Sequence, residues 1–284
     1  MEIRKVGVLG CGLMGSGIAQ VCATAGYDTL VREVNENLLQ KGLDGIRKFA
    51  GKLAERGQIK VSADDVMRNL HGTTQLEDMA DRDIIIEAVP EILDLKKQMF
   101  ETLGKVCQDE LILCSNTSSL SIIEMAMSFR HPERFLGLHF FNPVPRMELV
   151  EVVRTIICSE DVFKQAYSFA ASLGKKPVAA TDKPGFIVNR LLVPYLLDAI
   201  RAYEQGFGSI EDIDKGMQLG CGHPMGPFTL LDFVGLDTTY YIANIMFDEF
   251  KDPRFAAPTL LKRMVFAGQY GKKSGKGFYD YSSR

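Results

Sequence analysis

The sequence has few of the residues and spacings from which metal sites and disulfide frameworks are built. Its 284 residues include only four histidines and six cysteines, with no His-x-x-x-His spacing and no Cys-x-x-Cys pair. Such spacings are typical of zinc sites, so we expect no metal site. Most of the cysteines lie inside apolar runs, which favours buried free thiols in a reducing cytoplasm.

The sequence also lacks an excess of positive charge. Its formal net charge is -3, which provides no basic footprint for nucleic acid, so we expect no nucleic-acid partner. An anionic ligand must then be held by local groups, because the field of the whole protein does not attract it.

One stretch without charged side chains could suggest a membrane segment. Residues 6–27 are long enough to cross a bilayer, but they contain six glycines together with Ser16, Gln20 and Thr24. This composition is poor for membrane insertion and rich for a turn, and no cleavage site typical of a signal peptide follows. We therefore expect no membrane association, no targeting segment and a cytoplasmic location.

The same stretch contains a glycine pattern with a specific physical meaning. A short apolar run from Lys5 leads to Gly10, Gly12 and Gly15 in the spacing G-x-G-x-x-G, and a helical pattern follows from Leu13. After a strand, the first glycine allows a tight turn, the second lets the backbone approach a pyrophosphate, and the third lets the helix pack on the strand. Free N–H groups at the helix start attract phosphates. The pattern predicts a dinucleotide site.

An acidic residue stands where such a site needs one. The second expected strand, residues 27–32, is followed by Glu33, twenty-one residues after Gly12. A carboxylate there can accept hydrogen bonds from the adenosine ribose and would repel a 2'-phosphate, which predicts NAD as the cofactor. Arg32 slightly weakens the preference for NAD over NADP, and a glycine-rich turn without a ligand is the alternative interpretation.

The alternation of strands and helices continues to about residue 181. After a helical pattern that ends near Gly57, we expect strands at 83–89, 111–115 and 176–180, a further pair of strands within 137–153, and helices at 91–107, 121–129 and 163–173. This order predicts an α/β fold with a Rossmann-type doubly wound sheet, whose ligands bind outside the carboxyl ends of the strands.

The pattern becomes all-helical in the last third of the chain. From Pro184 onward the apolar positions follow helical spacing over 184–206, 209–219, 226–250 and 256–268, and we find no credible strand. We predict an NAD-binding domain at 1–182 and an all-helical C-terminal domain at 183–284. The apolar helices exceed what a monomeric domain of about 100 residues needs, so we expect a homodimer.

Polar side chains gather at the carboxyl ends of the expected strands. Residues 116–119, Asn-Thr-Ser-Ser, follow one strand, and His139 lies near the end of the next, with Asn142 just beyond it. Glu151 lies on the returning strand, and Asn189 lies where the second domain begins. A lone strand histidine is more often a core residue, but a histidine beside a glutamate at this edge is typical of a general base with an orienting carboxylate.

Seven motifs distributed over the whole chain strengthen this interpretation. They are GCGLMG, IIEAVPE, SNTSSL, HFFNPVPRMELVE, DKPGFIVNR, GCGHPMGPFTLLD and GKKSGKGFY. With them the sequence closely resembles the short-chain L-3-hydroxyacyl-CoA dehydrogenases, especially the bacterial 3-hydroxybutyryl-CoA type. The resemblance implies a Rossmann domain, a helical dimerising domain, and hydride transfer between NAD and the C3 hydroxyl of an acyl-CoA.

The resemblance also implies roles for individual residues. His139 would be the general base and Glu151 its orienting partner, while Ser118 and Asn189 would hold the hydroxyl and thioester region of the substrate. Contacts to NAD would come from Gly10, Gly12, Leu13, Met14, Gly15, Glu33, Glu91, Lys96, Asn116, Ser118, Asn142 and Lys273.

The coenzyme A contacts of that family come from the helix after the second strand. Lys52 and Arg56 are the candidates here, although this helix matches the family pattern least well. Phe49 stands where a small hydroxyl residue is often found, and Asp198 replaces a more usual glutamate, which we interpret as neutral.

Simpler interpretations and other functions stay open at this point. Ser118 could be a helix N-cap, Asn189 a cap or turn group, and Lys273 a solvated charge. The 3-hydroxyisobutyrate dehydrogenases share the glycine pattern but use a lysine base and lack HFFNP. Relatives that oxidise sugar acids would need no pantetheine groove, and a non-catalytic NAD-binding protein would need no intact set of polar residues at the sheet edge.

Overall fold

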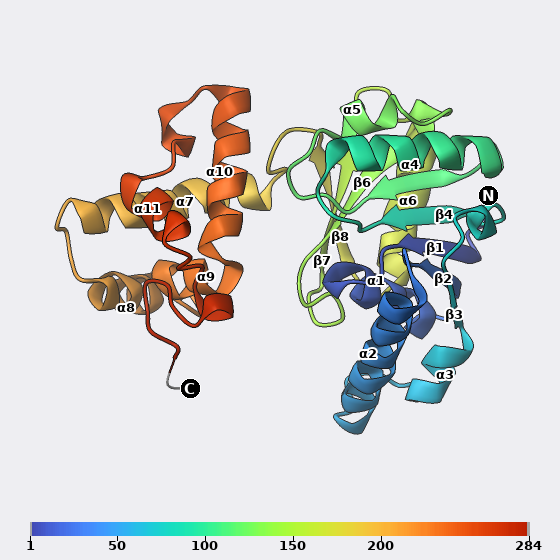
Figure 1. The fold of residues 1–284 in the computed structure, drawn as a ribbon, viewed down its shortest axis with the longest axis horizontal. Coiled ribbons are helices and arrows are strands. Elements are labelled where there is room, and N and C mark those ends of the chain that lie inside the picture. Colours follow the sequence, from blue (N-terminus) through green and yellow to red (C-terminus); the bar gives the residue numbers. More distant parts are fainter. Residues whose placement is uncertain (1, 283–284) are drawn as a thin grey trace. The chain divides into compact units, whose positions relative to one another are not determined.

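The computed structural model describes residues 2–282, which form two compact units that divide between Lys183 and Pro184 (Figure 1). The first unit is a sheet with helices on it, and the second is helical. None of the helices within residues 2–282 is long and apolar enough to cross a membrane.

An eight-stranded sheet forms the centre of the first unit. Its order is β3-β2-β1-β4-β5-β6-β7-β8, and all neighbouring pairs are parallel except β6 and β7, which are antiparallel. The strands are β1 (Lys5–Leu9), β2 (Asp28–Arg32), β3 (Leu70–Thr73), β4 (Ile84–Glu87), β5 (Ile112–Ser115), β6 (Phe135–Phe140), β7 (Leu149–Arg154) and β8 (Lys176–Thr181). The first six strands have the order of a dinucleotide-binding doubly wound sheet, so the predicted fold class is confirmed.

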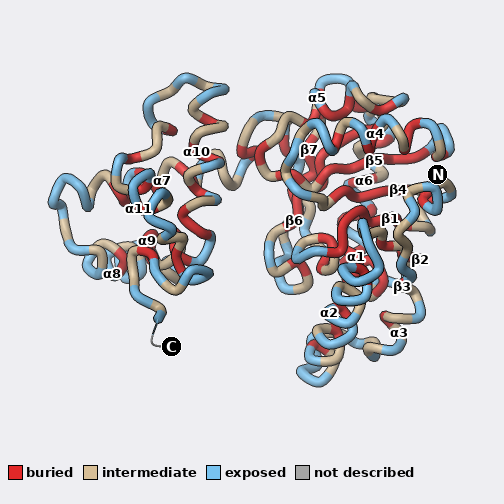
Figure 2. The backbone as a smooth tube through the Cα atoms, in the orientation of Figure 1, coloured by how far each residue is buried: buried red, intermediate tan, exposed pale blue. Residues whose placement is uncertain are grey.

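Helices cover this sheet on both faces. They are α1 (Leu13–Thr24), α2 (Glu36–Glu55), α3 (Ala63–Arg68), α4 (Leu93–Val106), α5 (Ile122–Ala126) and α6 (Glu160–Ser172). Ile84 and Ile86 of β4 belong to the apolar cluster that α1, α2, α3 and α6 complete. Ile85, between them, is also fully buried, and strand alternation directs it to the other face. Figure 2 shows the central strands as buried.

One pair of elements in the first unit was not predicted from the sequence. The short helix α3 and the edge strand β3 together occupy part of the segment between α2 and β4. The sequence of β3 is LHGT, and only Leu70 in it is buried. An edge strand with one buried side chain leaves no continuous apolar run, which explains the omission.

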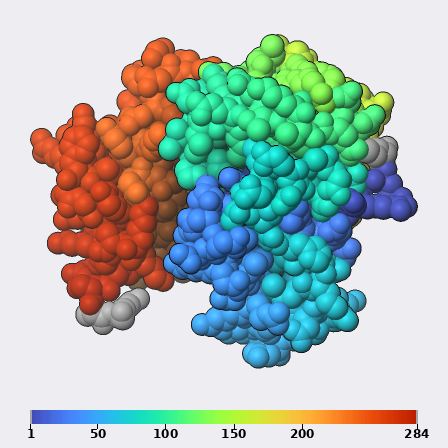
Figure 3. Space-filling view, turned by 45° about the vertical axis from the view of Figure 1, so that its right-hand side comes forward, coloured from blue at the N-terminus to red at the C-terminus, as the bar shows by residue number. Residues whose placement is uncertain are grey.

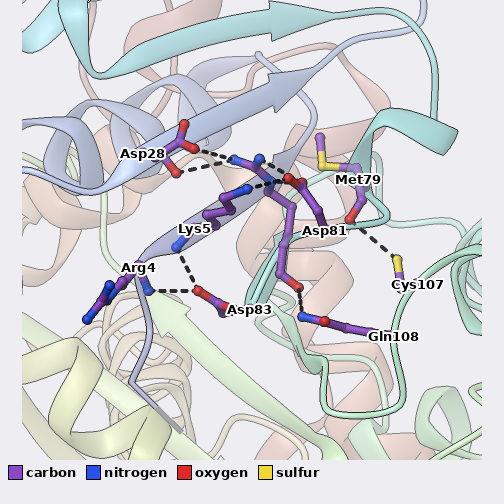
Figure 4. Close-up of polar contacts among 9 residues, drawn as sticks. Arg4, Lys5, Asp28, Met79, Asp81, Asp83, Cys107 and Gln108 are labelled. Carbon is purple, nitrogen blue, oxygen red and sulfur yellow. Dashed lines mark hydrogen bonds and ion pairs between the residues drawn. The ribbon is translucent and has the colours of Figure 1, made fainter.

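The amino end of the sheet is held by a fixed set of polar contacts (Figure 4). Asp83, just before β4, accepts the backbone N–H groups of Arg4 and Lys5 at 2.7 and 2.8 Å. Arg82 is 6% exposed and ion-pairs with Asp81 at 2.7 Å and with Asp28 at 3.3 Å. These groups lie at the end of the strands opposite to the predicted ligand edge, so they act on stability.

The second unit consists of α7 (Val188–Glu204), α8 (Ile210–Cys221), α9 (Pro227–Val234), α10 (Leu236–Phe250) and α11 (Thr259–Phe266), with no strand among its described residues up to 282. The prediction of one helix over 226–250 is wrong, because the helix is interrupted at Gly235, between α9 and α10. Its φ of 104° is outside the range of an α-helix and favours glycine. A Cβ at Gly235 would also lie 3.0 Å from Nζ of Lys273.

Two buried aspartates of the second unit bind its other segments. Asp214 of α8 accepts the N–H of Phe228 at 2.7 Å, and Asp232 of α9 accepts the N–H of Phe278 at 2.9 Å. Burial raises the pKa of the Asp232 carboxyl above its ordinary value, against the hydrogen bonds that lower it. The segment that carries Lys273 is therefore attached to the helical core through Asp232 and Phe278.

All six cysteines are free, and five of them are buried. Cys221 is exposed at the end of α8, so the expectation of buried thiols is wrong for this residue. Among the described part of the chain, no group of three or more His, Cys, Asp or Glu residues is arranged to hold a metal ion.

Candidate active site

The turn between β1 and α1 has the geometry that a pyrophosphate requires. Gly10 has φ of 93°, and a Cβ there would lie 2.7 Å from the carbonyl oxygen of Ala88. A Cβ at Gly15 would lie 1.9 Å from the carbonyl oxygen of Gly10, whereas a Cβ at Gly12 would meet nothing within 4 Å. No side chain caps α1 at Gly12, so its first N–H groups face open space. This cradle fits a dinucleotide phosphate.

Glu33 lies directly beside this turn. Its Oε2 accepts the backbone N–H of Cys11 at 2.8 Å and its Oε1 accepts that of Val34 at 2.7 Å. Burial raises the pKa of the Cys11 thiol to about 11, and the Glu33 carboxylate adds to that shift. The carboxylate is therefore oriented before any ribose binds, while the neighbouring thiol stays protonated near neutral pH.

We expect a strong preference for NADH over NADPH, because a fixed carboxylate repels a 2'-phosphate. The kcat/KM with NADH should exceed that with NADPH by more than about tenfold, which corresponds to about 1.4 kcal/mol. Glu33→Gln should narrow the difference, and Glu36→Gln, on the exposed first turn of α2, is the matched control. Equal kcat/KM values with both cofactors in the unmodified protein would contradict the assignment and direct attention to Arg32.

The loop after β5 carries two of the predicted site residues. Oδ1 of Asn116 accepts the N–H of Phe140 on β6 at 2.8 Å, which joins the ends of two strands. Ser118 is half-buried, and its hydroxyl makes no hydrogen bond within residues 2–282. The interpretation of Ser118 as a helix cap is wrong, because the N-cap of α5 is Ser121, whose Oγ accepts the N–H of Glu124.

His139 and Glu151 are partners across the antiparallel pair of strands. They are in register between β6 and β7, and Nδ1 of His139 lies 2.7 Å from Oε2 of Glu151. His139 is 6% exposed and Glu151 is 1% exposed. The ring of Phe141 lies 4.5 Å from the imidazole, measured between centroids. A buried carboxylate bound to one ring nitrogen fixes the tautomer and can stabilise an imidazolium.

Lys96 and Glu91 form an ion pair in which only the lysine is fully buried. Nζ of Lys96 is 2.6 Å from Oε2 of Glu91 and 3.1 Å from Oε2 of Glu87. Lys96 is only 1% exposed, whereas the Glu91 side chain is 29% exposed. The structure thus brings the two predicted cofactor residues together and adds Glu87, which our sequence reasoning missed. The signal was an acidic residue that ends the buried run DIIIE.

Asn142 lies at the start of the turn between β6 and β7 and lines a groove of the first unit. The peptide bond between Asn142 and Pro143 is cis. The groove is also lined by Leu13 at the start of α1, which is 74% exposed, and by Phe49 of α2. Met14 is half-buried in the first turn of α1. Of the predicted cofactor residues, Leu13 and Asn142 therefore border the same groove.

The predicted coenzyme A residues lie further along α2, which is drawn in blue on the surface in Figure 3. Lys52 and Arg56 are both exposed, at the end of the helix and just after it. The guanidinium of Arg146, which was not predicted, lies 5.9 Å from the ring centroid of Phe49. Nothing apart from exposure and charge distinguishes these cations, so their role stays a prediction.

Two further predicted residues belong to the second unit. Asn189 is the second residue of α7. Nζ of Lys273 lies 2.6 Å from Oδ1 of Asp237, and the lysine side chain is 49% exposed, so the simpler interpretation of a solvated charge stays open. The roles of both residues in binding stay predictions.

The fold and the glycine turn define an NAD-binding oxidoreductase of the doubly wound class. Residues 5–183 match the family model of the 3-hydroxyacyl-CoA dehydrogenase NAD-binding domain, and residues 185–281 match that of the 3-hydroxyacyl-CoA dehydrogenase C-terminal domain. The chain belongs to the 3-hydroxyacyl-CoA dehydrogenase family and is an NAD-dependent enzyme of that type.

Similar proteins span the whole chain. A 3-hydroxybutyryl-CoA dehydrogenase from Mycobacterium tuberculosis is 49% identical over 287 residues, which cover 98% of this chain and 99% of the relative. The human mitochondrial hydroxyacyl-coenzyme A dehydrogenase is 43% identical, with 98% and 91% covered. The crystal structure of FadB2 from M. tuberculosis has a TM-score of 0.96 at 48% identity, with 99% of this chain and 100% of that chain covered.

Proposed function

We propose that the protein interconverts (S)-3-hydroxybutyryl-CoA and acetoacetyl-CoA with NAD. The observation that carries the proposal is the buried His139–Glu151 pair, because oxidation of an alcohol by hydride loss requires a base for the hydroxyl proton. The choice of a four-carbon substrate is supported by the bacterial relatives that bear that name.

In the oxidative direction one proton and one hydride leave the substrate. The C3 hydroxyl gives its proton to Nε2 of His139, while Nδ1 stays bound to Glu151. NAD, held by the glycine turn and Glu33, would supply the acceptor for the hydride that leaves C3. In the reverse direction the imidazolium returns the proton to the forming alkoxide. Ser118 and Asn189 hold the hydroxyl and thioester region of the substrate in position for the transfer.

The residues of the first unit account for the remaining binding functions in this proposal. Glycines 10, 12 and 15 hold the pyrophosphate, and Glu33 holds the adenosine ribose. The Asn116 loop, Asn142 and the Glu91–Lys96 pair hold the nicotinamide half, with Lys273 from the second unit. Lys52 and Arg56 bind the phosphates of coenzyme A.

The test of this proposal is an assay of acetoacetyl-CoA reduction with NADH. The reaction is monitored by the loss of absorbance at the NADH band. A 3-hydroxyacid or sugar-acid dehydrogenase would act on free acids and ignore the thioester. A non-catalytic NAD-binding protein would bind NADH without turnover. Either result would reject the proposal. If acetoacetyl-CoA is reduced, kcat/KM across acyl chains of increasing length identifies the preferred substrate.

We also propose that the protein is a homodimer through the second unit. Its surface exposes large apolar side chains, among them Leu191 at 70%, Phe207 at 79% and Leu219 at 77%. Large exposed apolar patches mark association surfaces, and these side chains are the candidates for such a patch. We expect light scattering at micromolar concentration to give twice the chain mass of 31.6 kDa. A monomer at that concentration would refute the proposal.

A further inference from the structure

A chain of buried charges lies beneath the loop after β5. The Glu87 carboxylate, at the end of β4, is 0% exposed and accepts hydrogen bonds from Oγ of Ser115 at 2.6 Å and from the N–H of Val89 at 2.7 Å. Its Oε2 also lies 3.1 Å from Nζ of Lys96, which is 1% exposed. The polar groups around Glu87 thus come from three elements: Ser115 from β5, Lys96 from α4, and the N–H of Val89 from the segment after β4.

The chain continues from Lys96 to the backbone of the loop. Nζ of Lys96 donates to Glu91 at 2.6 Å, and Glu91 in turn accepts the hydroxyl of Thr117. Because that hydroxyl donates to Glu91, its lone pairs are directed at the N–H groups of Ser119 and Leu120, which they accept at 3.2 and 3.0 Å. Oγ of Ser119 also donates to Glu91 at 3.3 Å.

The loop is thus attached to Glu87 along three routes. The first runs through Lys96 and Glu91 to the hydroxyl of Thr117. The second runs through Ser115, whose Oγ accepts the N–H of Thr117 at 3.3 Å. The third is direct, because the carbonyl oxygen of Glu87 accepts the N–H of Asn116 at 2.8 Å. These contacts fix the backbone on both sides of Ser118, which lies at the centre of the loop.

Stability alone does not account for this arrangement. Buried charges cost desolvation, and well-packed apolar groups in their place are often equally or more stabilising. The amino end of the same sheet is held by carboxylates that remain partly exposed, such as Asp81 and Asp28. At the carboxyl end, by contrast, Glu87 is completely buried, and burial raises its pKa above the ordinary value despite the opposing effect of Lys96.

We propose that Glu87 is a positioning residue that fixes the loop 116–119, and with it Asn116 and Ser118, for hydride transfer. The inference rests on the proposed function for the roles of those two residues. Glu87 itself reaches them only through Ser115, Lys96 and the backbone. A loop held in this way keeps the reacting oxygen at one distance, and misplacement by about 1 Å is enough to cost on the order of 10²-fold in rate.

The test is Glu87→Gln, which keeps the shape but presents an amide N–H₂ or a neutral oxygen to the Lys96 ammonium. We expect kcat for acetoacetyl-CoA reduction to fall on the order of 10²-fold. The KM for the thioester should rise less, because the coenzyme A moiety is held elsewhere in the proposed function. In the ligand-free protein, amide hydrogen exchange at residues 117, 119 and 120 should become faster.

Ser115→Ala is the second variant, because it removes one of the three routes without leaving a buried charge unpaired. It should accelerate exchange at Thr117 and lower kcat by about tenfold, in line with loss of one hydrogen bond to a charged group. If Glu87→Gln does not fold, Ser115→Ala decides the question. Glu124→Gln is the matched control, because it removes a carboxylate 2.6 Å from the next lysine of α4, Lys97, at the surface.

Two outcomes would overturn the inference. One is a folded variant with wild-type exchange in the loop, and the other is faster exchange with unchanged kcat. The exchange measurement requires neither substrate nor cofactor. It therefore reports on Glu87 even if the unmodified protein fails to reduce acetoacetyl-CoA, which would reject the proposed function instead.

Discussion

Replacement of His139 by glutamine should lower kcat by roughly 10²–10⁴, the usual contribution of a positioned acid or base. The glutamine amide N–H₂ can still donate a hydrogen bond to the Glu151 carboxylate, so the hairpin should remain folded. Glutamine cannot take up or release a proton near neutral pH. The substrate oxygen at C3 must therefore lose or gain its proton without a general acid or base. The measurement is steady-state reduction of acetoacetyl-CoA with NADH, together with NADH binding by fluorescence titration.

The binding measurement separates a catalytic loss from a folding defect. NADH affinity should stay near that of the unmodified protein, because the glycine turn and Glu33 lie on other strands. His131→Gln is the control. His131 precedes β6, its Nε2 lies 3.3 Å from Oδ1 of Asp109, and its described contacts include no predicted site residue. A folded His139→Gln enzyme at nearly full rate would show that the histidine is a core residue and that the base lies elsewhere.

Glu151→Gln should also remove much of kcat, up to about 10⁴-fold where the loss of the carboxylate selects the wrong tautomer. The amide keeps the shape of the side chain, but its nitrogen can face Nδ1 and its neutral oxygen no longer stabilises an imidazolium. The double variant should be little worse than His139→Gln alone, because residues that act as a unit give non-additive losses.

The control for this cycle is Glu148→Gln, three residues earlier on the same hairpin, which breaks an exposed ion pair with Lys176. It should leave kcat unchanged. Losses that multiply in the double variant of His139 and Glu151 would mean that the two side chains act independently, despite the 2.7 Å between them.

The parts of the fold that sequence predicted are those with a strong local signal. The run from Lys5 to Gly10, the glycine turn and Glu33 determine the start of the sheet, since each residue type is needed for its own backbone or ligand reason. The edge strand β3 was missed because one buried leucine makes no pattern. The break at Gly235 was missed because a single glycine inside a helical pattern does not by itself show a positive φ.

The site divides in the same way between local and distant information. His139 and Glu151 were paired from the sequence, because a short hairpin joins their strands. Glu87 was not recognised, since its partners Ser115 and Lys96 come from separate elements that only the folded sheet brings together. Exposure and charge alone place Lys52 and Arg56 on α2, and no geometry in the first unit narrows their role.

The antiparallel hairpin of β6 and β7 has a consequence for how the protein can vary. His139 and Glu151 meet because they are opposite one another in a strand pair whose faces alternate with every residue. An insertion or deletion between 141 and 148 that shifted the pairing of β7 with β6 by one residue would turn the Glu151 carboxylate to the opposite face of the sheet. Changes of length that shift this pairing are therefore excluded more strictly than changes of the exposed side chains in the turn, as long as His139 and Glu151 must meet.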